Sequence, residues 1–148
     1  MIRLRNFTSA DAEILRQEQY HNMSIEEIES MICDWNKLDY QGKYFEMFAI
    51  MHGDTIIGTI SLFQRSDSIV SIGAELFPRF RGQGFGKQAV SLALEMCKSK
   101  DYKIAYTQVL SNNAASIALN RSLGFETDNY GYINKKGNEV YIFLKSLC

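Results

Sequence analysis

Residues 81–87 read Arg-Gly-Gln-Gly-Phe-Gly-Lys and lie between a strand-like run and a helix-like run. Three glycines in this short segment let backbone N–H groups approach a ligand without an intervening side chain. A helix that begins here points its free N–H groups and the positive end of its dipole at the same place. Such a helix start binds phosphate groups through the backbone alone. The segment therefore predicts an anion site.

The charges around this segment favour the same interpretation. From Leu76 to Leu94 the chain has no acidic residue, yet it contains Arg79, Arg81 and Lys87. A cation at a helix N-terminus opposes the dipole and costs about 0.3–1 kcal/mol. A bound anion would offset that cost. The alternative is a glycine-rich turn with solvated basic residues.

Three kinds of phosphate-binding motif are compatible with glycines at this place in the chain. A nucleoside-triphosphate loop needs Ser or Thr after Gly-Lys, and Gln88 stands there. The dinucleotide motif needs a third glycine where this chain has Lys87, and it opens a parallel sheet. The pattern Arg-x-x-Gly-x-Gly is met by Arg81, Gly84 and Gly86. The third motif fits best.

The composition is that of an ordinary globular protein. The 148 residues are 46% hydrophobic and 22% charged, which suits one domain spanning residues 1–148 with its own core. A net charge of −1 argues against a nucleic-acid partner. No apolar run is long enough for a membrane span, and no apolar segment follows the N-terminus as in a signal peptide, so we expect a cytoplasmic protein. Three scattered cysteines and two isolated histidines favour a reducing compartment and no metal.

Periodicity predicts an α+β fold. Alternation indicates strands over about residues 2–5, 44–51, 55–63, 68–77, 103–110, 125–133 and 139–144. Apolar positions at helical spacing and capping residues indicate helices over about residues 9–19, 25–37, 85–98 and 113–123. The order β-α-α-β-β-β-α-β-α-β-β predicts a central mixed, mostly antiparallel sheet of about seven strands flanked by about four helices. An antiparallel meander precedes the glycine segment. The glycine segment connects the first strand of a central β-α-β unit to its helix.

A second motif stands about 30 residues after the first. Asn113-Ala114-Ala115-Ser116 is followed by Leu123-Gly124-Phe125. With both motifs and this element order, nearly the whole chain resembles the GNAT superfamily of acyl-CoA-dependent N-acetyltransferases. The Asn-x-x-Ser form resembles the branch that includes ribosomal-protein N-terminal acetyltransferases. Each motif alone is moderately specific, and together they are strong.

The resemblance implies that acetyl-CoA is the co-substrate. It would lie in a V-shaped gap between the strands that end near Leu76 and Leu110, with its pantetheine arm along the main chain of residues 74–77. A backbone N–H near Leu76 would polarise the thioester carbonyl, and the amides of residues 82–87 would hold the pyrophosphate. Asn113 would contact the pantetheine or simply cap its helix. The residues implied to bind the donor are Leu76, Phe77, Arg81, Gly82, Gln83, Gly84, Phe85, Gly86, Lys87, Asn113 and Asn120.

The usual proton-transfer residues of the family are absent. Many relatives have a glutamate and a tyrosine at the positions of Gln108 and Asn120. Gln108 cannot act as a base, and Asn120 is no useful acid, although it could hydrogen-bond the sulfur. Glu75 could accept a proton from the amine, or it could be a solvated or ion-paired carboxylate. Ser116 could protonate the thiolate, or it could only bond the backbone of its helix turn; water could also remove the amine proton.

We therefore expect an N-acetyltransferase that moves an acetyl group to a primary amine of a small molecule or peptide by direct attack. Two alternatives stay open: a non-catalytic acyl-CoA-binding module and a nucleotide-phosphate binder. Relatives often dimerise, so a homodimer is open too. The aromatic residues that could recognise the acceptor are Tyr20, His21, Trp35, Tyr40, Tyr130 and Tyr132.

Overall fold

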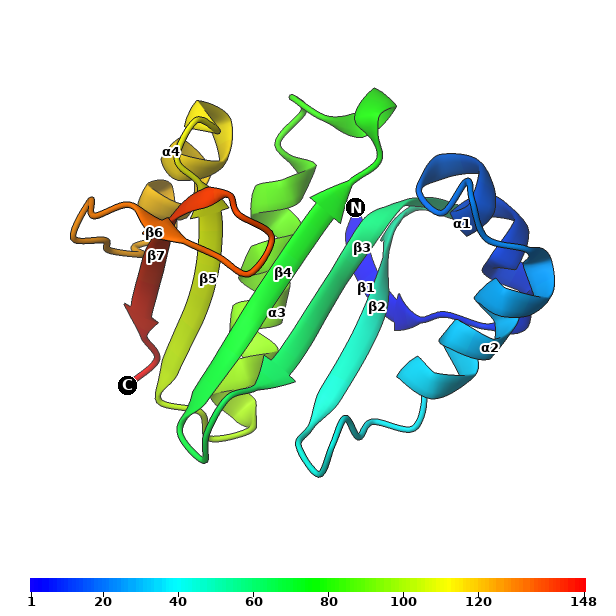
Figure 1. The fold of residues 1–148 in the computed structure, drawn as a ribbon, viewed down its shortest axis with the longest axis horizontal. Helices are drawn as coiled ribbons and strands as arrows, with labels where there is room; N and C mark the ends of the chain where they lie inside the picture. The colour runs from blue at the N-terminus through cyan, green and yellow to red at the C-terminus, as the bar shows by residue number, and fades with distance from the viewer.

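A computed structural model describes residues 1–148 and contains one seven-stranded sheet in the order β1-β2-β3-β4-β5-β7-β6 (Figure 1). The strands are β1 (Ile2–Asn6), β2 (Phe45–His52), β3 (Thr55–Gln64), β4 (Ile69–Leu76), β5 (Ile104–Leu110), β6 (Tyr132–Ile133) and β7 (Glu139–Ser146). The α-helices are α1 (Ala12–Glu18), α2 (Ile25–Trp35), α3 (Phe85–Ser99) and α4 (Ala114–Ser122), with 3-10 turns η1 (Ser9–Asp11) and η2 (Pro78–Phe80). The predicted fold class and element order are confirmed. None of the helices combines the length and apolar composition that crossing a bilayer requires.

The pairing of β4 with β5 is the one parallel contact in the sheet, and it is short. Only Ile69–Ser71 of β4 pair with Ile104–Tyr106 of β5. On its other side β4 pairs with β3 as far as Leu76. The two strands diverge beyond Ser71, and Figure 1 shows their upper halves apart with α4 beside the top of β5. This divergence leaves half of one β4 edge without a partner strand.

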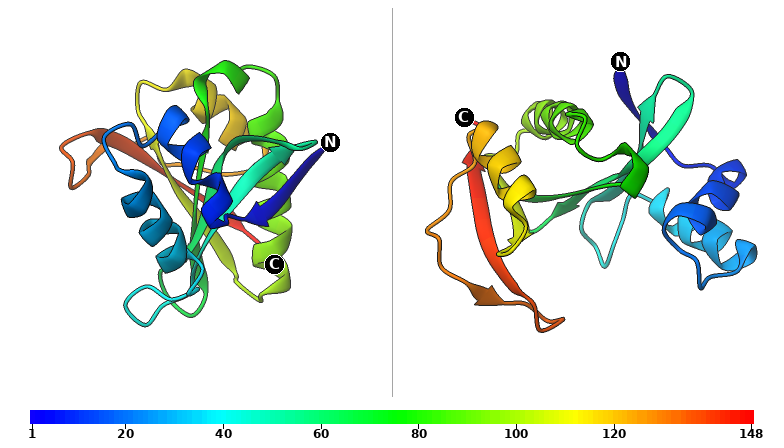
Figure 2. Two further views of the ribbon diagram at one scale, coloured as in Figure 1. Left: turned by 90° about the vertical axis from the view of Figure 1, so that its right-hand side faces the viewer. Right: turned by 90° about the horizontal axis from the view of Figure 1, so that it is seen from above.

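Helices cover opposite faces of the sheet, as the alternation of β2 shows. Phe48 and Ile50 belong to the core that includes the buried face of α3. Ala49 and Met51 belong to a second core that includes α1 and α2. Figure 2 shows α3 on one side of the sheet and α1 with α2 on the other. Because successive side chains of a strand point to opposite faces, one apolar strand serves both cores.

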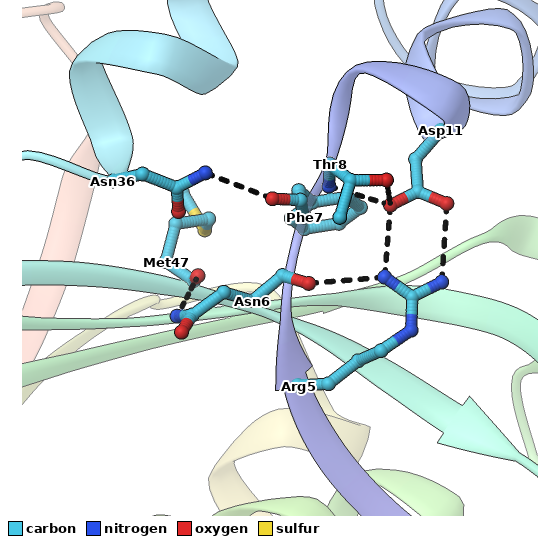
Figure 3. A network of polar contacts seen from close by, with 7 residues as sticks. All are labelled: Arg5, Asn6, Phe7, Thr8, Asp11, Asn36 and Met47. Carbon is cyan, nitrogen blue, oxygen red and sulfur yellow. Dashed lines mark hydrogen bonds and ion pairs between the residues drawn. The ribbon is translucent and has the colours of Figure 1, made fainter.

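A polar network joins β1 to the first two helices (Figure 3). Arg5 donates from Nη1 and Nη2 to the Asp11 carboxylate at 2.8 and 3.1 Å, and Asp11 also accepts the Thr8 N–H at 2.8 Å. Asn36, after α2, donates to the Phe7 carbonyl at 2.9 Å. Burial alone raises the pKa of Asp11, but the bonds from Arg5 and Thr8 outweigh it and lower the pKa below its ordinary value. The network holds α1 and α2 in place beside the sheet.

Local capping signals are confirmed. Ser24 and Glu27 form the predicted capping box, although α2 ends at Trp35 rather than near Lys37. Asn113 caps α4 by accepting the Ser116 N–H. In α3 the apolar residues Val90, Ala93, Leu94 and Cys97 are buried, whereas Leu92 is 38% exposed.

The predicted strand over residues 125–133 is wrong for most of its length. Only β6 and an isolated bridge between Glu126 and Leu144 form in this region. Asp128 Oδ1 accepts the Tyr130 N–H at 2.9 Å, and Thr127 Oγ1 accepts the Asn129 N–H at 3.2 Å. Asn129 also has a φ of 60°, which is incompatible with a strand. Side chains thus satisfy the backbone locally and compete with a ladder.

Candidate active site

The gap between β4 and β5 opens into a cleft of about 930 Å³. Four segments form most of its lining: the second half of β4, the glycine loop of residues 81–86, the facing side of β5, and α4 with the residue that caps it. Of the residues predicted to form the site, those that line the cleft are Glu75, Leu76, Arg81, Gly82, Gly84, Gly86, Asn113, Ser116 and Asn120. The fold thus brings both sequence motifs and Glu75 to one cavity.

The β4 edge that faces the cleft has N–H groups free for a ligand. The Phe77 N–H points toward β3 and donates to the Ile57 carbonyl at 2.8 Å. Since successive N–H groups of a strand point to opposite sides, the Leu76 N–H points into the cleft, and so does that of Ala74. An extended ligand can pair with such an edge as an added strand would.

The glycine loop has the backbone conformation that an anion site needs. Gly82 and Gly84 have φ values of 76° and 83°, and a Cβ at either position would meet nothing within 4 Å. Glycine is therefore required there by the left-handed backbone rather than by packing. Gly84 is the N-cap of α3, a helix of 15 residues whose first N–H groups have no partner within the helix. A Cβ on Gly86 would lie 3.3 Å from Leu119 of α4, so Gly86 allows close packing of α4.

Four of the predicted donor-binding residues have side chains outside the cleft lining. Phe77 is buried in the core with α1 and α2. Phe85 stacks on His52 with ring centroids 4.7 Å apart. Gln83 donates to the Arg79 carbonyl at 3.5 Å, and Lys87 is exposed. Any contact of these four with a ligand in the cleft would therefore come from backbone groups, which stays a prediction.

Residues 76–94 contain no acidic residue, but the fold brings carboxylates from other segments to their arginines. Arg79 pairs with Glu18 at 2.8 Å, and Arg81 Nη2 lies 3.9 Å from Glu75 Oε1. The Arg81 Nε also donates to the Leu76 carbonyl at 3.0 Å. Arg81 thus links the loop to the last residues of β4, and its charge is only partly free for a ligand.

Glu75 lies on the cleft side of β4 and is held by two partners. Gln19, just after α1, donates from Nε2 to Glu75 Oε2 at 3.0 Å. The second partner is Arg81, and the Glu75 side chain stays 55% exposed. Burial and, to a smaller extent, the charge of Glu75 raise the pKa of the nearby Tyr20 hydroxyl. The sequence offers no signal for Gln19, because the contact spans 56 residues.

The second motif places three polar side chains on the other wall. Asn113 Oδ1 accepts the Ser116 N–H at 3.1 Å. Asn120 is buried and donates from Nδ2 to the Ser116 carbonyl at 2.9 Å and to the Ser116 hydroxyl oxygen at 3.4 Å. Asn120 uses one acceptor site of the Ser116 hydroxyl, and that hydroxyl donates no hydrogen bond to another protein group.

A model of the acetyltransferase (GNAT) domain matches residues 2–126 of the chain. The chain belongs to the GNAT acetyltransferase family. A structure of an acetyltransferase from Salmonella typhimurium that modifies the N-terminal serine of a 50S ribosomal subunit protein is 20% identical and has a TM-score of 0.80, with 98% of this chain and 94% of that chain covered. Spermidine N-acetyltransferase from Vibrio cholerae, in complex with CoA and spermine, is 16% identical and has a TM-score of 0.79, with 99% and 95% covered. At identities of 20% and 16%, these similarities show a shared fold and no more.

One curated relative shares sequence over part of the chain. An uncharacterised protein of Methanocaldococcus jannaschii is 34% identical over 85 residues, which are 57% of this chain. The matched stretch spans only 18% of the length of that relative.

The positions where many GNAT enzymes have proton-transfer groups are used differently in this chain. Gln108 donates from Nε2 to the Tyr106 hydroxyl at 2.8 Å. Asn120, as described, holds the first turn of α4. Neither residue ionises, so neither can serve as an acid or base. The structure contains no group of three or more metal-ligating side chains.

The aromatic residues considered for acceptor recognition do not line the cleft of this GNAT fold. Tyr20 packs against Trp35 at 6.3 Å, and Tyr130 packs against Tyr132 at 4.9 Å. Tyr40 and Trp35 line a separate hollow of about 590 Å³ beside α2. At the end of the cleft away from the glycine loop lie Arg65, Ser71 and Tyr106, none of which is among the predicted site residues.

Proposed function

We propose that the protein transfers the acetyl group of acetyl-CoA to a primary amine of a peptide or small molecule. The observation that carries the proposal is the single cleft in which the free edge of β4 meets the glycine loop and the N-terminus of α3. Family membership and the CoA-bound state of a structural neighbour support the same donor.

The donor would lie with its pyrophosphate on the amides of residues 82–87 and its pantetheine arm along the free β4 edge. The left-handed glycines and the helix start favour an anion at the loop. In this pose the Leu76 N–H donates to the thioester carbonyl oxygen. That donor would stabilise the oxyanion as the carbonyl carbon becomes tetrahedral.

The reaction needs three proton transfers and no covalent enzyme intermediate. The ammonium of the acceptor first loses a proton, to Glu75 directly or through a water molecule. The neutral amine then attacks the carbonyl carbon, and the nitrogen of the tetrahedral intermediate loses its second proton to water. As the intermediate collapses and the C–S bond breaks, Ser116 would donate its proton to the departing thiolate from the opposite wall and regain one from water. Positioning and proton handling would supply the catalysis.

The acceptor class rests on what similar structures bind. One neighbour modifies the N-terminal serine of a ribosomal protein, and the other is a spermidine acetyltransferase. Both acceptors offer a primary amine, which supports an amine acceptor for this chain.

A second candidate function is a non-catalytic acyl-CoA-binding module. Gln108 and Asn120 favour it, because both are amides committed to structural hydrogen bonds. In that case CoA would bind and no amine would release thiol.

A matched pair of glycine variants tests the donor site. Gly84→Glu places a carboxylate where the pyrophosphate would bind, whereas Gly137→Glu makes the same change at a φ of 82° in a turn away from the cleft. The backbone strain is matched because the two φ values are nearly equal, and in both variants the new side chain enters open space. We expect thermal stabilisation by acetyl-CoA to be lost only in Gly84→Glu. Stabilisation by ATP or NAD but not by acetyl-CoA would refute the donor assignment.

Thiol release from acetyl-CoA against a panel of amines and peptides tests the reaction itself. Release above background with at least one amine supports catalysis. Tight CoA binding with no release from any acceptor would favour the binding-module alternative.

A further inference from the structure

An arginine with no acidic partner lies at the far end of the cleft from the glycine loop. Arg65 follows β3, and its guanidinium carbon lies 4.2 Å from the centroid of the Tyr106 ring. Its Nε also donates to the Ser71 hydroxyl. Gln108 in turn donates to the Tyr106 hydroxyl at 2.8 Å. Ring and hydroxyl together fix the direction of the guanidinium, and all of these residues line the cleft.

The charge of Arg65 is not neutralised within the protein. None of the four ion pairs includes Arg65, so no carboxylate oxygen lies within 4.0 Å of it. Lys43 adds a second positive charge nearby by donating to the Arg65 carbonyl at 3.0 Å. Because Nε is committed to Ser71, the two terminal nitrogens remain for a ligand. A planar guanidinium with free nitrogens suits a carboxylate.

The donor phosphates cannot be the partner of this arginine in the proposed binding mode. Ser71 is where β4 and β5 still pair, whereas the glycine loop follows the other end of β4. Leu76 is five residue steps along the strand from Ser71, which is about 16 Å. The acceptor, not the donor, would occupy the Arg65 end.

We propose that Arg65 determines acceptor specificity by binding a carboxylate of the acceptor, and that the acceptor is a short peptide segment whose carboxylate lies three or four residues from its free amine. The inference rests on the proposed transfer reaction. Three or four extended residues span about 10–14 Å. The reach of the Arg65 side chain makes up the rest of the distance between Ser71 and Leu76. A single amino acid, with amine and carboxylate on one carbon, is too short. A polyamine offers only positive charges to Arg65.

Three tetrapeptides that share an N-terminus test the proposal in the thiol-release assay. One has a free C-terminal carboxylate, the second has a C-terminal amide, and the third is an amide with glutamate as its fourth residue. We expect kcat/KM for the first or third to exceed that for the neutral amide by about fivefold, since the gain from an ion pair at an exposed site is modest. If the first peptide is preferred, Arg65 binds a C-terminal carboxylate; if the third is preferred, it binds an acidic side chain. The preference should decrease as salt is added.

The same comparison is made with Arg65→Gln, Arg65→Lys and the control Arg3→Gln. Arg3 lies on the edge strand β1, which β2 and β3 separate from β4, so its loss removes the same charge without touching the cleft. We expect the preference for the carboxylate to vanish in Arg65→Gln, to return in part in Arg65→Lys and to be unchanged in Arg3→Gln. A role of Arg65 in folding alone would lower all three rates together and leave their ratio unchanged.

Two failures can be told apart. If no peptide or other amine releases thiol, the proposed reaction is wrong. If the neutral amide reacts as well as both carboxylate peptides, or if Arg65→Gln keeps the preference, the reaction stands and the role of Arg65 is wrong.

Discussion

Gly58→Ala should distort the cleft between β4 and β5 from the β3 side. Gly58 lies on β3 opposite Leu76, and a Cβ there would be 2.3 Å from the Glu75 carbonyl oxygen and 2.9 Å from the Leu76 Cα. Both contacts are with backbone, so no side-chain rotation can relieve them. Ordinary contacts begin at 3.4 Å, so β4 would have to move about 1 Å away from β3 and into the cleft.

The expected cost has two parts. Overpacking of this kind costs about 1–3 kcal/mol. The same movement lengthens the 2.8 Å bond from the Phe77 N–H to Ile57, which adds about 1 kcal/mol. A total of about 2–4 kcal/mol corresponds to a Tm roughly 5–15 °C lower for a domain of this size. Since the Leu76 N–H moves with its strand, kcat/KM should decrease by about 100-fold.

Thermal and urea unfolding measure the stability, and thiol release at a temperature where the variant stays folded measures the activity. Gly73→Ala on β4 is the matched control, because its Cβ would meet only the Ser61 hydroxyl at 3.2 Å, which can rotate away. We expect the free energy of unfolding of the control to stay within about 1 kcal/mol of wild type. If the free energy of unfolding of Gly58→Ala equals that of Gly73→Ala, then the backbone of β4 does not lie too close to Gly58 to accept a Cβ, and the reasoning is refuted.

Three further predictions concern the network at α1 and the wall formed by α4. Asp11→Asn should destabilise the protein more at pH 7 than at pH 3. Because the pKa of Asp11 is lowered in the folded protein, its pair with Arg5 stabilises the fold above the ordinary pKa of 3.8, and this stabilisation is lost as the pH decreases through the folded pKa. Equal losses of stability in urea unfolding at both pH values would refute this. Asn113→Ala should cost about 1 kcal/mol by removing the cap of α4, whereas Asn112→Ala, at an exposed neighbour, should cost little; chemical denaturation compares the two. Ser116→Ala should lower kcat by about 100-fold with the Kd for CoA unchanged, and wild-type turnover would exclude Ser116 as the proton donor.

Much of the fold could be predicted because its signals are local. The capping boxes depend on residues three positions apart, and the glycine loop depends on backbone conformations open to Gly82 and Gly84 themselves. Local signals also explain why the predicted strand over residues 125–133 is wrong. Its β-forming residues resemble a strand, but Thr127 and Asp128 bond their own backbone, and that competition is decided by fine geometry.

The sequence predicts the glycine loop, the capped helix of the second motif and the order of the elements around them, because each of these depends on neighbours along the chain. The tertiary structure alone decided which charges remain free. Arg79 and Arg81 stand in a segment without acids, yet the fold brings Glu18 and Glu75 to them. Arg65 has no signal in the sequence, yet the fold leaves it unpaired over Tyr106. Electrostatic contacts depend on distance in space, and the packing of strands and helices sets that distance.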